Sequence, residues 1–404
     1  MFSYPYLCEL LSTNYGLQAE VKSLPGEIDL NYHVSTSNGE QYILKIAGPN
    51  EKLENLELQN AVMEHFSQKN GDLEVSRVVS SKDGKLIQII EEEGKSRFVR
   101  LLTWINGRPF ANANPQSPLL FNRLGELCGN LCLSLADFDH PAAHRFMKWD
   151  PQQAEWIKPH LSKFTNERGE LVNYFYSLFE QHALPYFPNL RKSVNYNDAN
   201  DYNVLVSNDA KDPIVPGVID FGDLVYTQTI NELAIALAYA MMDKPDPIQT
   251  ACEVVKGFNS KFKLHEDELK VLFSLTTARL IISITCAELN RLEHPDNIYL
   301  QISDKAAWTL LGKLQSISPA FAEYCFRESC GLTPCPAGND FENWASVHHK
   351  QVVSPIEIEN YDWLDLSVGS LDLGNMRDVL DADKFDEQIV LLMRKNKVEL
   401  SLGR

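Results

Sequence analysis

Residues 198–206 read Asp-Ala-Asn-Asp-Tyr-Asn-Val-Leu-Val, and residues 217–223 read Gly-Val-Ile-Asp-Phe-Gly-Asp. Two short apolar runs therefore each carry acidic or amide side chains at one end, with turn-forming residues between them. The pattern predicts a β-hairpin with Asp198 and Asn203 before one strand and Asp220 after the other. Phosphoryl transfer uses such groups, because one carboxylate orients a hydroxyl while an amide oxygen and a second carboxylate hold Mg²⁺.

The same hairpin has a simpler interpretation, in which surface Asp and Asn residues occupy ordinary turns. An Asp followed five residues later by an Asn is expected about once by chance in a chain of 404 residues of average composition. The functional interpretation therefore depends on the strands beside the pair and on the rest of the chain.

The two loops resemble the catalytic and metal loops of the aminoglycoside phosphotransferase/choline kinase family, whose fold is protein-kinase-like. That family's pattern is His-Gly-Asp-x-x-x-x-Asn followed by Ile-Asp-Phe/Trp-x-Asp/Glu. The resemblance spans residues 10–340 and is nearest the hydroxylysine kinase branch and the kinase-like N-terminal domain of class III aminotransferase fusion proteins. It implies that Asp198 is the catalytic residue and that the metal ligands are Asn203, Asp220 and Asp223.

The chain departs from this pattern at two positions. Tyr196 stands in place of His, and Asn197 in place of Gly. Tyrosine offers an apolar body with one polar tip, and asparagine is among the residues that best tolerate a positive φ. The resemblance implies that Tyr196 and Glu232 brace the catalytic loop. The two departures also leave open a protein whose catalysis is weak or lost.

A lysine inside an apolar run points to a nucleotide site in the N-terminal part. Lys45 lies within Tyr-Ile-Leu-Lys-Ile-Ala at residues 42–47, and a buried lysine needs a partner. In kinase-like folds such a lysine grips nucleotide phosphates and is held by an acidic helix residue. Glu57 is the first candidate for that partner and Glu54 the alternative. Lys45 could instead lie on an edge strand, where a lysine opposes aggregation.

The nucleotide itself is expected to lie between two further segments. Residues 25–27 with Asn31 take the place of the family's nucleotide loop, although they contain a single glycine. The backbone of Thr103, Trp104 and Ile105 reads as the hinge between two lobes, where an adenine edge could bind. This second assignment depends mostly on the resemblance.

The resemblance and the periodicity together predict an α+β, protein-kinase-like fold with two lobes. The expected parts are an N-lobe over residues 1–105, a helical C-lobe over residues 106–340 and a C-terminal extension over residues 341–404, which resembles the start of a further module. The N-lobe pattern predicts strands over 18–24, 31–36, 41–47 and 98–105, a hairpin over 73–90 and one helix over 51–70. The C-lobe helices are expected at residues 119–136, 152–162, 169–182, 229–242, 246–258, 266–291, 299–316 and 319–330.

Composition limits the classes of partner. The formal net charge is −18, which argues against nucleic acid and anionic membranes and suits a cationic substrate. The eight scattered cysteines lack the paired spacing of a zinc site and read as reduced thiols. Residues 1–11 lack the features of a signal peptide. We therefore expect a cytoplasmic protein; its oligomeric state is left open.

Three functions fit these observations. The favoured one is an ATP- or GTP-dependent, Mg²⁺-requiring kinase that phosphorylates a hydroxyl of a small, cationic, amine-bearing substrate, either a hydroxylysine-like amino alcohol or an aminoglycoside. The second is a catalytically weak nucleotide-binding or regulatory module of a multidomain protein. The third, a metal-dependent hydrolase built on the same acidic residues, leaves Lys45 unexplained and ranks last.

Overall fold

The computed structural model describes residues 2–26, 28–69, 73–92, 94–209, 211–293 and 304–336. The chain divides into two compact units, residues 1–315 and residues 316–404. The first unit contains the predicted site. In the second unit the described residues form helix α9 (Pro319–Ser329), and the expected extension over residues 341–404 lies outside the described residues.

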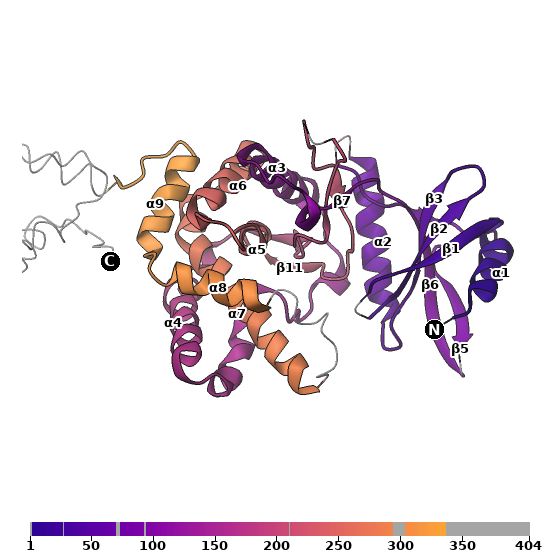
Figure 1. Ribbon diagram of the computed structural model, residues 1–404, viewed down its shortest axis with the longest axis horizontal. Helices are drawn as coiled ribbons and strands as arrows, with labels where there is room; N and C mark the ends of the chain where they lie inside the picture. Colours follow the sequence, from indigo (N-terminus) through magenta and orange to yellow (C-terminus); the bar gives the residue numbers. More distant parts are fainter. Residues whose placement is uncertain are drawn as a thin grey trace, which may run out of the picture. The chain divides into compact units, whose positions relative to one another are not determined.

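The N-terminal lobe is an antiparallel sheet with a helix on each face (Figure 1). Its main strands run in the order β1, β2, β3, β6, and both β4 and β5 pair with β6. The hairpin expected over residues 73–90 is therefore wrong in its pairing, because the nine-residue β6 accommodates a short strand at each end. The bounds are β1 (Ala19–Leu24), β2 (Leu30–Thr36), β3 (Gln41–Ile46), β4 (Val78–Val79), β5 (Gln88–Glu92) and β6 (Lys95–Thr103).

One face of this sheet is an apolar core closed by helix α1 (Tyr4–Tyr15). Side chains alternate between the two faces of a strand. Alternate residues of β2, β3 and β6 therefore pack with the buried leucines of α1 in a single cluster. The sequence analysis missed α1, although its ends are marked: the Ser3 side chain accepts from the Tyr6 N–H, and Gly16 adopts a φ of 74°.

Helix α2 (Leu53–Gln68) lies on the other face and corresponds to the helix predicted over residues 51–70. Its C-terminal end contacts the helical lobe. His65 Nε2 lies 2.9 Å from the Ser134 carbonyl oxygen, and Lys69 Nζ, just beyond the helix, lies 2.7 Å from Asp137 Oδ2. Ser134 and Asp137 belong to the end of α3 (Pro118–Leu135) and the residues that follow it. These contacts fasten α2 to the second lobe.

The second lobe begins with two small sheets that frame the predicted loops. β7 (Arg108–Pro109) pairs with β9 (Val204–Val206), and β9 pairs with β10 (Gly217–Val218). The predicted hairpin is thus formed. A second pair, β8 (Lys192–Asn195) with β11 (Val225–Gln228), precedes the first loop and follows the second. This pair, which the sequence analysis did not predict, holds the outer ends of both loops together.

The rest of the first unit is helical. α3 and α6 cross with their backbones almost touching, since a Cβ added at Gly125 would lie 1.9 Å from the Val254 carbonyl oxygen. The segment predicted as a helix over 152–162 is instead 3₁₀, as suits a stretch that contains Pro159. The α-helical bounds are α4 (Asn166–His182), α5 (Asn231–Ala240), α6 (Pro247–Lys261), α7 (Glu266–Glu293) and α8 (Asp304–Leu314), and the 3₁₀ segments are η1 (Phe110–Asn112), η2 (Pro141–Ala143), η3 (Pro151–Lys163) and η4 (Leu184–Asn189).

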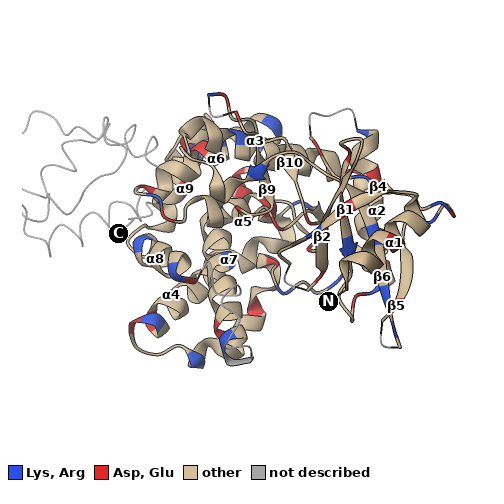
Figure 2. Ribbon diagram, turned by 45° about the vertical axis from the view of Figure 1, so that its right-hand side comes forward, with Lys and Arg blue, Asp and Glu red and all other residues tan. Residues whose placement is uncertain are grey.

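Helix α7 is the most apolar long element of the described residues. By length and composition residues 266–291 could cross a membrane, yet 89% of the most apolar window is buried within the fold. It therefore serves as the core of the helical lobe. Figure 2 shows acidic and basic residues interspersed over the helices and strands.

Candidate active site

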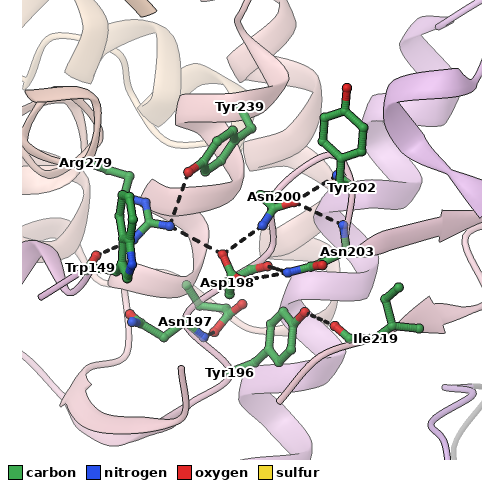
Figure 3. A network of polar contacts seen from close by, with 11 residues as sticks. Trp149, Tyr196, Asn197, Asp198, Asn200, Tyr202, Asn203, Ile219, Tyr239 and Arg279 are labelled. Carbon is green, nitrogen blue, oxygen red and sulfur yellow. Dashed lines mark hydrogen bonds and ion pairs between the residues drawn. The ribbon is translucent and has the colours of Figure 1, made fainter. Parts of the chain in front are cut away.

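The loop between β8 and β9 is built around Asp198, whose side chain is 18% exposed. Asn203 Nδ2 donates to Asp198 Oδ2 at 2.6 Å, and Asn200 Nδ2 donates to Asp198 Oδ1 at 2.9 Å (Figure 3). Asn200 Oδ1 in turn accepts from the backbone N–H groups of Tyr202 and Asn203. Such a side-chain turn fixes the loop without regular secondary structure. Asn200 was not among the residues singled out in the sequence.

The contact between Asp198 and Asn203 also orients the asparagine amide. Because its nitrogen faces Asp198, its carbonyl oxygen is directed away from that carboxylate, where it can serve a cation. The Ile219 N–H donates to the backbone carbonyl oxygen of Asn203 at 2.9 Å, which joins this loop to the one that carries Asp220.

Asp220 stands at the end of β10 in a left-handed conformation with φ 62°. Its Oδ1 accepts the Gly222 N–H at 3.2 Å, and 47% of its side chain is exposed. Its Oδ2 lies 3.5 Å from Lys45 Nζ, and this ammonium lowers the pKa of Asp220. Asp220 is therefore an accessible carboxylate that stays ionised, as a metal ligand must be.

Lys45 reaches this loop from β3, but its partners differ from those expected. Its side chain is 9% exposed, and Nζ lies 3.5 Å from Asp29 Oδ2 as well as from Asp220 Oδ2. Glu57 and the alternative Glu54 lie on the exposed side of α2. The expected pairing is wrong because the helix turns its amide side chains, and not its carboxylates, toward the sheet.

Two buried residues, Tyr196 and Asn197, fix the loop that carries Asp198. The Tyr196 hydroxyl donates to the Ile219 carbonyl oxygen, and the ring packs edge-on against Phe221 at 5.3 Å. Asn197 adopts a φ of 66°, and its N–H donates to Glu232 Oε2 at 2.9 Å. Burial raises the pKa of Glu232 to about 7. Tyr196 thus contributes a side-chain hydrogen bond and a ring contact, whereas Asn197 contributes its backbone N–H.

Arg279, on α7, is the main residue of this site that the sequence analysis missed. Its Nη2 lies 3.4 Å from Asp198 Oδ1 and 3.2 Å from the Tyr239 hydroxyl, and its Nη1 donates to the Trp149 carbonyl oxygen. The guanidinium also lies 4.9 Å from the centre of the Trp149 ring. A signal was available, because an arginine inside an apolar helix needs a partner for the reason given for Lys45.

Charges around Asp198 act in opposite directions. Burial raises the pKa of Asp198 well above its usual range, and the negative charge of Asp223 raises it further. The positive charge of Arg279 lowers it. Asp223, predicted as an acidic contributor to the metal site, is therefore close enough to act on the proposed catalytic carboxylate.

The expected nucleotide-binding segments belong to interior strands of the sheet: Asn31 lies in β2, and Thr103 ends β6. The Asn31 Nδ2 donates to the Pro25 carbonyl oxygen at 3.2 Å, and Asn31 stands opposite Lys45 in the strand register. At the hinge, the N–H groups of Thr103 and Trp104 donate to the Arg77 and Gln41 carbonyl oxygens. These contacts leave the Ile105 N–H and the carbonyl oxygens of the segment unused, and the hinge assignment stays a prediction.

The oxygen atoms at this site suit a hard divalent cation. Asn203 and Asp220 offer an amide oxygen and a carboxylate, the ligand types that Mg²⁺ takes together with phosphate oxygens and water. No group of three His, Cys, Asp or Glu side chains within the described residues is placed to hold a metal by itself. A cation here would depend on the phosphates of a nucleotide.

Comparisons with known proteins identify relatives of this chain. The model of the phosphotransferase enzyme family matches residues 20–253. Hydroxylysine kinase of Mus musculus is 28% identical over 338 residues, which cover 78% of this chain and 89% of that protein. Hydroxylysine kinase of Danio rerio is 26% identical over 327 residues, covering 77% of this chain and 91% of that protein.

Solved structures confirm the predicted kinase-like fold. Amicoumacin kinase hAmiN, in complex with AMP-PNP, Ca²⁺ and Ami, superposes with a TM-score of 0.58 at 17% identity, covering 77% of this chain and 94% of that one. A microcompartment-associated aminopropanol kinase superposes with a TM-score of 0.59 at 18% identity, covering 81% of this chain and 98% of that one.

Proposed function

The chain belongs to the phosphotransferase enzyme family, and from that premise we propose that it transfers the γ-phosphoryl group of ATP or GTP to a hydroxyl of a hydroxylated amino acid. At the coarser level the protein is a small-molecule phosphotransferase. The nucleotide, the Mg²⁺ and the acceptor belong to the proposal.

One observation carries it. Lys45 Nζ and Asp220 Oδ2 come from different lobes and lie 3.5 Å apart. Asn203 Nδ2 lies 2.6 Å from Asp198 Oδ2. The loop that carries these two residues is joined to the Asp220 loop by the hydrogen bond from the Ile219 N–H. An amine, two carboxylates and an amide oxygen thus converge from separate elements. An ordinary hairpin with surface acids would not bring a buried lysine to the same point.

Each group has a role in this proposal. Asp198 orients the acceptor hydroxyl and takes its proton, and Lys45 neutralises charge on the nucleotide phosphates. Asn203 and Asp220, assisted by Asp223, would hold Mg²⁺, which supplies charge stabilisation to the transferred phosphoryl group. The protein therefore acts by positioning and electrostatics, without a covalent enzyme intermediate.

The charges near Asp198 favour one acceptor class over the other. The guanidinium of Arg279 is permanently positive and stands beside the proposed base. It attracts a carboxylate and repels a polycationic aminoglycoside, whereas Asp198 and Asp223 attract an amine. A zwitterionic acceptor such as 5-hydroxylysine satisfies both signs, and the hydroxylysine kinases among the relatives support this choice.

The test is a substrate panel. We expect release of ADP or GDP when the protein, Mg²⁺ and ATP or GTP are incubated with 5-hydroxylysine, and slower release with ethanolamine, 1-amino-2-propanol or kanamycin. Asp198→Asn should abolish the stimulated rate while nucleotide binding persists. If the protein binds nucleotide tightly but no acceptor stimulates the release of ADP or GDP, the alternative of a catalytically weak nucleotide-binding module would be favoured. The cytoplasmic location and the absence of nucleic-acid and membrane partners remain predictions.

A further inference from the structure

A row of polar residues crosses the face of the N-terminal sheet that α2 covers. In the strand register Lys45 stands opposite Asn31 on one side and opposite Arg100 on the other. Residues in register on neighbouring strands point to the same face, so the two cations lie side by side. Arg100 is 2% exposed. Two buried positive charges in this row need compensation from groups nearby.

Helix α2 compensates Arg100 and not Lys45. Arg100 Nη1 donates to Asn60 Oδ1 at 2.8 Å, and Nη2 donates to Gln59 Oε1 at 2.6 Å. Both acceptors are neutral amides. The acidic residues of α2 are Glu54, Glu57 and Glu64, and all three are exposed. Helix α2 therefore directs amides, and not carboxylates, at this row of residues.

The carboxylate that reaches Lys45 comes from the turn between β1 and β2. Asp29 Oδ1 accepts the Gly48 N–H at 3.0 Å, and Oδ2 lies 3.5 Å from Lys45 Nζ. The turn is folded tightly against the end of β3, since a Cβ added at Gly48 would lie 2.4 Å from Ile28 Cγ2. Asp29 is 23% exposed on its side chain. It is thus fixed by one oxygen and directed at the lysine by the other.

We propose that Asp29 is the positioning residue for Lys45 and takes the part that a carboxylate on α2 would otherwise play. The proposal rests on the proposed function, because it concerns how the nucleotide site is held. Lys45 lies at the same 3.5 Å from Asp29 and from Asp220. The attraction of Asp29 keeps the ammonium from settling on Asp220 alone, and Asp220 stays available to a divalent cation.

The decisive variant is Asp29→Asn, which keeps an oxygen for the Gly48 N–H and removes the charge that faces Lys45. Lys45 should then pair with Asp220 and oppose the cation there. We expect the Mg²⁺ concentration that half-saturates binding of a non-hydrolysable ATP analogue to rise about fivefold, as one partly buried ion pair allows. The kcat should fall about 10-fold to 100-fold, with the KM for the acceptor unchanged.

Three companion variants sharpen the result. Asp29→Glu restores the charge and should recover part of the loss. Glu57→Gln removes the rival carboxylate, and Glu20→Gln removes an exposed charge on β1; both should match the wild type. Thermal unfolding of each variant establishes that it is folded. If Asp29→Asn does not fold, the Mg²⁺ dependence of Asp29→Glu, whose longer side chain moves the carboxylate relative to Lys45, is compared with that of the wild type.

A double-mutant cycle tests whether Asp29 acts through Lys45. If it does, Asp29→Asn adds nothing to the Mg²⁺ dependence of Lys45→Met. The proposal is overturned if Asp29→Asn binds Mg²⁺ and nucleotide like the wild type, if its effect adds in full to that of Lys45→Met, or if Glu57→Gln reproduces it. A wild-type protein that binds no nucleotide overturns the proposed function as well, so the two failures can be told apart.

Discussion

Arg279 places a buried positive charge beside Asp198. It is buried, it stacks on Trp149 and it contacts one oxygen of Asp198. Since burial and Asp223 both raise the pKa of Asp198, a nearby positive charge is needed to keep that carboxylate ionised.

Replacing Arg279 with Met should impair Asp198 as a base. Without the guanidinium the pKa of Asp198 rises further, so the acidic limb of the pH profile of kcat/KM should move to higher pH. We expect kcat to fall about 10-fold to 100-fold, since a displaced or protonated base loses most of its contribution. Arg279→Lys keeps the charge and should leave the limb in place. An unchanged profile in Arg279→Met would show that the guanidinium does not act on Asp198.

Glu232 should make stability depend on pH. Its pKa is raised by burial from 4.5 to about 7, so the folded state binds a proton that the unfolded state has released between these values. The stabilisation is complete below about pH 4.5 and is lost as pH rises to about 7. Glu232→Gln still offers an oxygen to the Asn197 N–H and lacks this titration.

The free energy of unfolding of the wild type should therefore fall relative to that of Glu232→Gln by about 1–3 kcal/mol across this window. Urea denaturation at several pH values measures the difference. Parallel curves for the two proteins would mean that Glu232 does not titrate there.

At the scale of elements, the crossing of α3 and α6 depends on glycine. Gly125→Ala should destabilise the protein by about 2–4 kcal/mol, because the new Cβ would lie 1.9 Å from a carbonyl oxygen of α6. The matched control is Gly312→Ala on α8, where an added Cβ meets no atom within 4 Å. There the better helix propensity of alanine should stabilise by about 0.5–1 kcal/mol. Chemical denaturation of both variants checks the contrast, and equal effects would contradict the predicted close packing.

An element could be predicted from the sequence when the residues that determine it lie close together in the chain. The β9–β10 hairpin was predictable because its two strands follow each other in the chain, with a cluster of turn-forming residues between them. The β8–β11 pair was not, since two short runs separated by more than twenty residues carry no mutual signal. Segment η3 had helical periodicity, but Pro159 removes a backbone donor, and the segment winds as 3₁₀.

The site shows the same limit. The sequence indicated Asp198, Asn203, Asp220 and Lys45, whose roles remain predictions, and the fold brings them together. It did not indicate Asp29 as the partner of Lys45. Which side chains of α2 point toward the sheet depends on their hydrogen bonds to Arg100, which lies on a strand far along the chain. Arg279 could have been found by asking what a charged residue does inside an apolar helix.

At the scale of the whole molecule, nucleotide binding should hold the two lobes together. Lys45 belongs to the sheet and Asp220 to the helical lobe, so a Mg²⁺–nucleotide complex that contacts both stabilises the folded unit by linkage. At about one hundred times its Kd the nucleotide should add about 2.7 kcal/mol, seen as a raised Tm. Lys45→Met and Asp220→Asn should each lose most of this shift, whereas Glu20→Gln should keep it. A shift that survives both substitutions would place the nucleotide elsewhere.

Helix α2 is tied to the helical lobe through His65 and Lys69 and contributes no carboxylate to Lys45. Many kinases are switched off when the corresponding helix swings outward and drops the lysine. In this chain the Lys45 ammonium is paired instead with Asp29, in a turn of its own sheet. We therefore expect that a displacement of α2 alone would leave the proposed nucleotide contact of Lys45 in place.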